Sequence, residues 1–107
     1  MRQSALIPAF NEAESIVSVL IGLRRVLPEI EILVVDDGST DGTAELALEF
    51  GAQVVRRKRG GYAAALRTGY RHLLGQGVEQ VIQLDADGQH PPEAALGLFE
   101  GLSEANW

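Results

Sequence analysis

The chain has 107 residues, 46% of them hydrophobic and 22% charged, which is typical of one globular domain and excludes a disordered or fibrous protein. Nine basic residues against fifteen acidic ones give a net charge of -6, which argues against broad binding to nucleic acid or anionic membranes. The sequence has no cysteine, no signal-like start and no apolar run of membrane-spanning length, so disulfides and thiolate metal sites are excluded and a cytoplasmic location is expected.

Strand and helix signals alternate from the first residues onward. A short apolar run over 4–7 predicts a first strand that Pro8 stops. The N-x-x-E pattern of Asn11 and Glu14 then predicts a helix start, in which the asparagine side chain accepts hydrogen bonds from the first-turn amides. Apolar residues recur at helical spacing until Pro28. The β-branched run over 30–35 follows and predicts a second strand covered on both faces.

The second half continues this alternation. Its predicted elements are a helix over 44–50, a strand over 52–55, a helix over 62–74 and a strand over 78–84. Asp41 is placed to cap the first of these helices and Gly51 to close it. Pro92 suits the first position of a last helix, whose apolar residues are Leu96, Phe99 and Leu102.

This alternation predicts an α/β fold with a largely parallel sheet of about four strands and helices on both faces. In open sheets of this kind, ligands bind beyond the carboxyl ends of the strands. The loops at that edge are PAFNE, DDGSTD, RKRGG and DADGQ. We expect these four polar loops to meet in one site.

The loop after the fourth strand carries the strongest chemical signal. Asp85 and Asp87 follow the apolar run directly, and two carboxylates about 4 Å apart would repel each other by roughly 4 kcal/mol at an effective dielectric constant near 20. A hard divalent cation bound through oxygen atoms, with Gln89 as a further ligand, relieves that repulsion. The alternative is a solvated turn, because Asp-Ala-Asp-Gly is also common turn chemistry.

Other polar residues of the loops allow a structural and a functional interpretation. Asp37 is expected to accept hydrogen bonds from a nucleobase or ribose, and helix capping does not require Glu12. The basic run over 56–59 is either a solvated charged segment or a surface facing diphosphate oxygens or an acidic acceptor. His72 is expected on a helix surface, and His90 lies near the acidic loop without a defined role. GxGxxG and P-loop motifs are absent from the sequence.

Four segments, in order and at similar spacing, resemble the amino-terminal half of a family 2 glycosyltransferase with the GT-A fold. They are IPAFNEAESI, VVDDGSTDGT, GYAAALRTGY and QLDADGQHPPE, and they are most similar to the dolichyl-phosphate mannosyltransferase-like members. The resemblance implies a Rossmann-like, nucleotide-sugar-binding half of an inverting, metal-dependent transferase. It also implies a UDP- or GDP-sugar donor and an acceptor such as a polyprenyl phosphate, reached from the inner face of a membrane.

The resemblance also implies roles for individual residues. Donor contacts would come from Pro8, Phe10, Glu12, Val35, Asp37, Asp85, Ala86 and Asp87. Asp85, Asp87 and Gln89 would hold Mg²⁺ or Mn²⁺. Phe10 stands where the family often has tyrosine, and Ala63 where it often has glycine, so a hydroxyl contact is lost and the third loop is altered.

The catalytic residues stay unassigned, because the chain ends at Trp107 before the acceptor-side residues and catalytic base of this family. We therefore expect residues 1–107 to be the donor-binding portion of a longer enzyme. Three alternatives are open from the sequence: a signalling receiver domain with Asp85 as phosphoacceptor, a haloacid-dehalogenase-type phosphatase, and a nucleotide-binding module without turnover.

Overall fold

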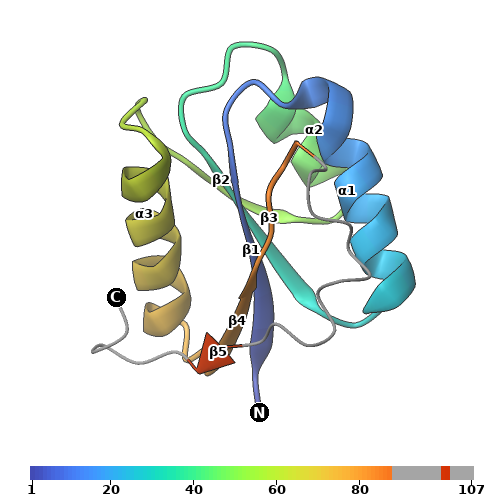
Figure 1. Ribbon diagram of the computed structural model, residues 1–107, viewed down its shortest axis with the longest axis vertical. Coiled ribbons are helices and arrows are strands. Elements are labelled where there is room, and N and C mark those ends of the chain that lie inside the picture. Colours follow the sequence, from blue (N-terminus) through green and yellow to red (C-terminus); the bar gives the residue numbers. More distant parts are fainter. Residues whose placement is uncertain (88–99, 102–107) are drawn as a thin grey trace.

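The computed structural model describes residues 1–87 and the backbone of residues 100–101. Its elements are β1 (Gln3–Ala9), α1 (Ala13–Val26), β2 (Glu31–Asp36), α2 (Thr43–Glu49), β3 (Gln53–Arg56), α3 (Tyr62–Gly75), β4 (Gln80–Gln83) and β5 (Glu100–Gly101). The strands form one sheet in the order β3-β2-β1-β4-β5 (Figure 1). Each strand from β1 to β4 pairs in parallel with its neighbours among these four, which confirms the predicted parallel sheet.

The short strand β5 was not predicted. It pairs antiparallel with β4, with Gln80 opposite Gly101. The helix expected from Pro92 falls mostly outside the described residues. At Glu100–Gly101, which the structure does describe, the expectation of helix is wrong because these two residues extend the sheet.

Helices cover both faces of the sheet, as predicted (Figure 1). Ile32 and Val34 of β2 pack in the cluster that contains α1 and α2 side chains, whereas Leu33 and Val35 pack in the cluster that contains α3 side chains. This split follows from the period of two in a strand. Among the described helices, none combines the length and apolarity needed to cross a bilayer.

Pro8 lies inside β1, so the expectation that it ends the strand is wrong. Leu6 accepts a backbone hydrogen bond from Leu84, which follows β4, whereas Ala9 accepts one from Asp37, which follows β2. Backbone groups two residues apart face the same neighbour, so Pro8 faces the β4 side, beyond the last paired residue of that strand. The N–H that proline lacks therefore removes no hydrogen bond from the sheet.

The start of α1 also differs from its prediction. Glu12 is the N-cap residue, and Asn11 lies before it with a left-handed φ of 51°. The side-chain oxygen of Asn11 accepts a hydrogen bond from the Thr40 amide at 2.9 Å instead of from first-turn amides. The Ala13 amide donates to Asp41 Oδ2 at 3.1 Å. Side chains thus connect the loop after β1 to the loop after β2.

Candidate functional site

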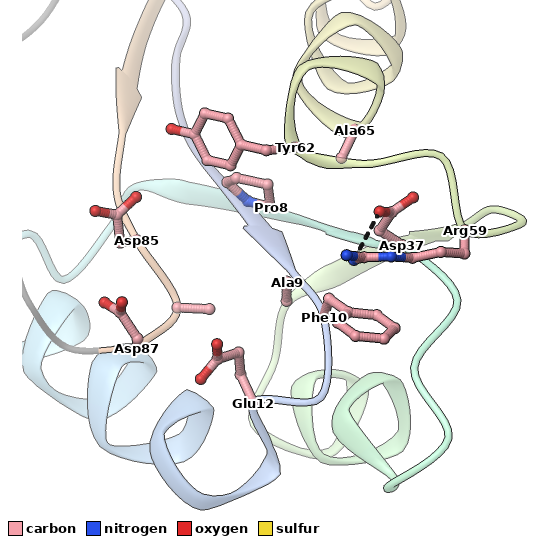
Figure 2. A pocket seen from close by; sticks show the side chains of 11 residues that line it. Pro8, Ala9, Phe10, Glu12, Asp37, Arg59, Tyr62, Ala65, Asp85 and Asp87 are labelled. Carbon is pink, nitrogen blue, oxygen red and sulfur yellow. Dashed lines mark hydrogen bonds and ion pairs between the residues drawn. The ribbon is translucent and has the colours of Figure 1, made fainter.

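A cavity of about 420 Å³ opens at the carboxyl edge of the sheet. Its lining residues are Pro8, Ala9, Phe10, Glu12, Asp37, Arg59, Tyr62, Ala65, Asp85, Ala86 and Asp87 (Figure 2). They come from the segments that follow all four parallel strands, so the predicted meeting of the four loops is confirmed. The cavity has an acidic end and an end where an aromatic ring, an arginine and a buried aspartate come together.

The acidic end is formed by Glu12, Asp85 and Asp87, which line the same part of the cavity (Figure 2). Asp85 is half-buried, Asp87 is exposed, and Ala86 between them is buried. Their oxygen atoms are the donors that Mg²⁺ and Mn²⁺ prefer. Within residues 1–87, no group of three histidine, cysteine or acidic side chains is already arranged around a metal position. Gln89, the third predicted ligand, lies outside the described residues.

Ser15 connects the acidic turn to helix α1. Its hydroxyl donates to the Ala86 carbonyl at 2.5 Å and lies 3.1 Å from Glu12 Oε2. Sequence reasoning missed Ser15, because a serine in the first turn of a helix is ordinary and its partner is 71 positions away. The turn that carries Asp85 and Asp87 is therefore held against the start of α1.

Asp37 is a buried carboxylate at the other end of the cavity, with a side chain that is only 3% exposed. It accepts hydrogen bonds from the amides of Gly60 and Gly61, both at 2.9 Å. Arg57 Nε lies 3.1 Å from its Oδ1 and Arg59 Nη1 lies 3.2 Å from its Oδ2. Three hydrogen-bond donors thus reach this carboxylate, and Arg57, whose Nε–H donates to the Lys58 carbonyl, adds a positive charge beside it. Asp37 therefore organises the loop after β3, in addition to lining the cavity.

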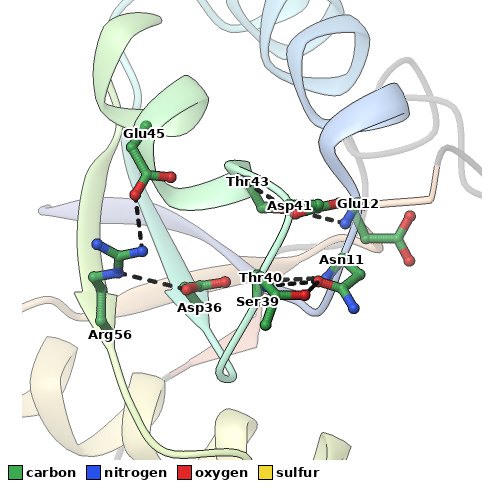
Figure 3. A network of polar contacts seen from close by, with 9 residues as sticks. All are labelled: Asn11, Glu12, Asp36, Ser39, Thr40, Asp41, Thr43, Glu45 and Arg56. Atoms are coloured by element: carbon green, nitrogen blue, oxygen red, sulfur yellow. Dashed lines mark hydrogen bonds and ion pairs between the residues drawn. The ribbon is translucent and has the colours of Figure 1, made fainter.

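The basic run over 56–59 is neither a uniformly solvated segment nor a free anion-binding surface. Arg56 Nη2 pairs with Glu45 at 2.9 Å, and its Nε lies 3.6 Å from buried Asp36 (Figure 3). Arg57 also donates to the Thr68 hydroxyl and reaches the Ala64 carbonyl at 3.1 Å. The arginines thus join β2, α2 and α3 at the sheet edge.

Phe10 and Arg59 form a stacked pair at the rim of the cavity. The guanidinium carbon of Arg59 lies 3.6 Å from the centroid of the Phe10 ring, which is within cation–π distance. Tyr62 also lines the cavity, and its hydroxyl accepts a hydrogen bond from Gln83 at 2.8 Å. Gln83 in turn accepts one from Tyr70 at 3.0 Å. Sequence reasoning did not place Tyr62 in the site, and it offered Arg59 only as part of a basic run that could face diphosphate oxygens or an acidic acceptor.

Val35 is the one predicted donor residue among the described ones that does not line the cavity. Its side chain is completely buried in the cluster between the sheet and α3. Helix α3 packs closely against the sheet at Gly69. A Cβ added at this glycine would come within 2.4 Å of Leu6 Cδ1 and 3.1 Å of Val35 Cγ2. Val35 therefore packs in the core between the sheet and α3, outside the lining of the cavity.

Solved glycosyltransferases have the same fold as this chain. One is a mannosyltransferase from Pyrobaculum calidifontis in complex with GDP-Man and Mn²⁺, with a TM-score of 0.69 and 30% identity over 80% of this chain and 27% of that one. Another is glucosyl-3-phosphoglycerate synthase from Mycobacterium tuberculosis with Mn²⁺, UDP and glucosyl-3-phosphoglycerate, with a TM-score of 0.64 and 31% identity over 79% of this chain and 33% of that one. These similarities confirm the predicted GT-A type of α/β fold.

Sequence comparison points in the same direction. The chain is 37% identical to the undecaprenyl-phosphate mannosyltransferase of Micrococcus luteus over 99% of its own length and 46% of that protein. It thus spans less than half the length of this curated relative. The family model described as Glycosyl transferase family 2 matches residues 4–106, which leaves the receiver-domain and phosphatase alternatives without support. The chain belongs to glycosyl transferase family 2.

Proposed function

We propose that this chain is the donor-binding portion of an inverting, metal-dependent glycosyltransferase that takes a sugar from a nucleotide-sugar. The observation that carries the proposal is the two-ended cavity at the carboxyl edge of the sheet. Similar proteins are described with GDP-Man and Mn²⁺, or with UDP and Mn²⁺. A nucleoside diphosphate sugar has an aromatic base at one end and a charged diphosphate toward the other, which matches the two ends of the cavity.

In the proposed orientation, the base and ribose lie between Phe10 and Asp37, with Pro8 as part of the wall. The diphosphate and sugar lie near Asp85, Ala86 and Asp87, with Glu12 beside them. The aromatic ring offers a stacking surface, and the buried carboxylate offers an acceptor for a base N–H. This orientation keeps the negatively charged phosphates away from Asp37.

Phosphates beside aspartates require a cation between them, which is why the proposal includes Mg²⁺ or Mn²⁺. Asp85 and Asp87 are suited to hold it, with Gln89 as a further proposed ligand, and phosphate oxygens would complete the shell. When bound, such a metal stabilises the negative charge of the departing nucleoside diphosphate. The residues of this chain would orient the donor, and Ser15 would keep the aspartate turn against α1.

The proposed acceptor is a polyprenyl phosphate, because the relative from Micrococcus luteus is named an undecaprenyl-phosphate mannosyltransferase. Such an acceptor would place the reaction at a membrane surface, and we propose its cytoplasmic face. No catalytic base is assigned within residues 1–107. A donor-binding module without turnover is therefore the second candidate, and it makes the same prediction for donor binding.

Calorimetric titration with UDP-, GDP- and dTDP-sugars, each with and without Mn²⁺, tests the proposal and identifies the base. We expect one nucleotide to bind in a metal-dependent manner. Asp87→Asn should remove that metal dependence, whereas Glu49→Gln, which removes an equal charge from an exposed position on α2, should not. Absence of metal-dependent binding for every nucleotide would contradict the proposed function.

A further inference from the structure

We propose that the guanidinium of Arg59 occupies the nucleobase position of the cavity in the ligand-free protein, and that a nucleotide binds by displacing it. The inference rests on the proposed function, because it assigns a competitor to the same site. Its basis is one side chain in contact with both features of the base position. Arg59 stacks on Phe10 at 3.6 Å and donates to Asp37 Oδ2 at 3.2 Å (Figure 2).

The guanidinium and a nucleobase satisfy the same two partners by the same chemistry. Both are flat, both stack on an aromatic face, and both carry N–H donors in their own plane. Within a nucleoside, uracil keeps one ring N–H, and guanine keeps one ring N–H beside an amino group. A base stacked on Phe10 with an N–H toward Asp37 would overlap the position of the Arg59 guanidinium. Arginine and base therefore exclude each other.

Displacement requires only a rotation of the Arg59 side chain, because hydrogen bonds and close packing fix the backbone around this residue. The next two amides, those of Gly60 and Gly61, donate to Asp37 at 2.9 Å. On the other side, Gly38 approaches so closely that an added Cβ would lie 2.9 Å from the Arg59 amide nitrogen. The Arg59 side chain itself is 54% exposed. The guanidinium can therefore leave while the loop keeps its shape.

The buried carboxylate stays compensated after Arg59 leaves. Arg57 Nε is 3.1 Å from Asp37 Oδ1, and the two glycine amides are unaffected by a rotation of the Arg59 side chain. One acceptor position on Oδ2 becomes available for one N–H of an incoming base. Departure of Arg59 thus exchanges one donor for another without leaving an unpaired buried charge.

The test separates the base from the diphosphate. Affinities for uridine and guanosine are measured by NMR titration, and affinities for inorganic diphosphate with Mn²⁺ by calorimetry, on the chain and on Arg59→Ala. Because the variant has no competitor for the base position, we expect it to bind the recognised nucleoside about threefold to tenfold more tightly, as the loss of one exposed ion pair and one cation–π contact implies. Diphosphate affinity should be unchanged.

Lys58→Ala is the matched control, because it removes the same charge from the neighbouring exposed position, which does not line the cavity. It should bind nucleosides as the unmodified chain does. Equal nucleoside affinity in Arg59→Ala and Lys58→Ala would overturn the inference. Weaker diphosphate binding in Arg59→Ala alone would also overturn it, by making Arg59 a phosphate ligand. Matching thermal unfolding midpoints would establish that both variants fold.

A direct observation complements the affinities. In the ligand-free chain, the ring current of Phe10 should shift the side-chain resonances of Arg59, and saturation with the recognised nucleoside diphosphate should remove this shift. A shift that persists at saturation would overturn the inference while leaving the proposed function intact. If no nucleoside diphosphate binds the unmodified chain at all, the proposed function and this inference fail together.

Discussion

Two pairs of aspartates lie at the same edge of the sheet, and their surroundings are opposite. Asp36 is the last residue of β2 and Asp37 follows it, and the two are 1% and 2% exposed, whereas Asp85 is half-buried and Asp87 exposed after β4. Arg56 at the end of β3 reaches Asp36, and Arg57 and Arg59 of the loop after β3 reach Asp37. The second pair lines the open cavity beside Glu12. Aspartates thus form buried ion pairs at one end of the site and line the open cavity at the other.

Strand order explains the difference. β3 lies next to β2, so the arginines that follow β3 are adjacent to the carboxylates that follow β2. β4 lies on the other side of β1, so two strands, β2 and β1, lie between it and β3, which carries the arginine loop. Whether two aspartates at a strand end are buried in ion pairs or face the cavity therefore depends on which loop the sheet places beside them.

The largest expected effect concerns Asp37. Asp37→Ala leaves Arg57, Arg59 and two glycine amides without their buried acceptor. A hydrogen bond to a charged group contributes about 1.5–3 kcal/mol to the unfolding free energy, and three such bonds are lost, so we expect a loss of at least about 3 kcal/mol. Urea unfolding measures this loss, and Asp37→Asn serves as a milder second variant. Asp87→Ala should lower the unfolding free energy less, by at most about 1 kcal/mol, because its side chain is exposed and polar contacts at exposed positions contribute little. Equal losses at Asp37 and Asp87 would remove the distinction between the pairs.

The second effect is on ligand binding at the acidic end. Asp85→Asn or Asp87→Asn should lower Mn²⁺-dependent nucleotide affinity about a hundredfold, because even outer-sphere changes at metal sites cost tenfold to a hundredfold. Affinity for the nucleoside without metal should be preserved, since Phe10 and Asp37 are unchanged. Isothermal titration of both variants measures the two quantities separately. A parallel loss of nucleoside affinity would mean that the ends of the cavity are not independent.

A third effect concerns pH and the loop that carries the buried pair. The hydrogen bond from the Thr43 hydroxyl, with those from the Ala13 and Thr43 amides, lowers the pKa of Asp41. A lowered folded pKa contributes stability that is present above the unfolded value of about 3.9 and is lost as pH falls toward the folded value. The N-cap of α2 is Gly42 and not Asp41, so the predicted cap is wrong, but Asp41 still accepts from the first amides of α1 and α2. Asp41→Ala should therefore cost about 1–2 kcal/mol at neutral pH, as loss of an acceptor at a helix start does, and flatten the acid side of the stability profile. Urea unfolding between pH 7 and pH 3 checks both; an unchanged profile would contradict this role.

The smallest effect sharpens the description of the acidic end. Ser15→Ala removes the hydroxyl that donates to the Ala86 carbonyl, which should cost about 1 kcal/mol of stability. It should also weaken Mn²⁺-dependent nucleotide binding a few-fold by loosening the aspartate turn. Ser18→Ala, at an exposed position of the same helix, is the control for helix propensity. If the two variants behave alike, the Ser15 contact does not position the turn.

Local patterns predicted the elements that local chemistry determines. The apolar runs gave the strands β1 to β4, the helical spacings gave α1 and α3, and the alternation gave the edge where the loops meet. Errors arose where a residue's partner comes from a distant segment. Asn11 fits a capping pattern, but its side-chain oxygen accepts a hydrogen bond from the Thr40 amide instead. Pro8 fits inside β1 because it lies beyond the last residue that pairs with β4.

The site was predictable in its composition but not in its internal contacts. The aspartates and Phe10 were identified from motifs. The hydrogen bonds that Asp37 accepts, however, come from the loop after β3, which is more than twenty residues away in the sequence. Arg59 belongs to a run of four basic residues, and the sequence does not indicate which of the four stacks on an aromatic ring. Val35 follows the family motif, but its alternation along β2 points its side chain into the core.

The hydrogen bonds between the first two loops have a consequence for the entropy of binding. Asn11 and Asp41 link the segment that carries Phe10 to the segment that carries Asp37, and the Glu12 amide adds a bond to the Thr43 hydroxyl at 3.0 Å. Because these hydrogen bonds already hold the two loops together, a ligand does not have to order them relative to each other when it binds. Ordering a mobile side chain on binding costs about 0.5–1.5 kcal/mol, so a preorganised pair of walls keeps that free energy available for affinity.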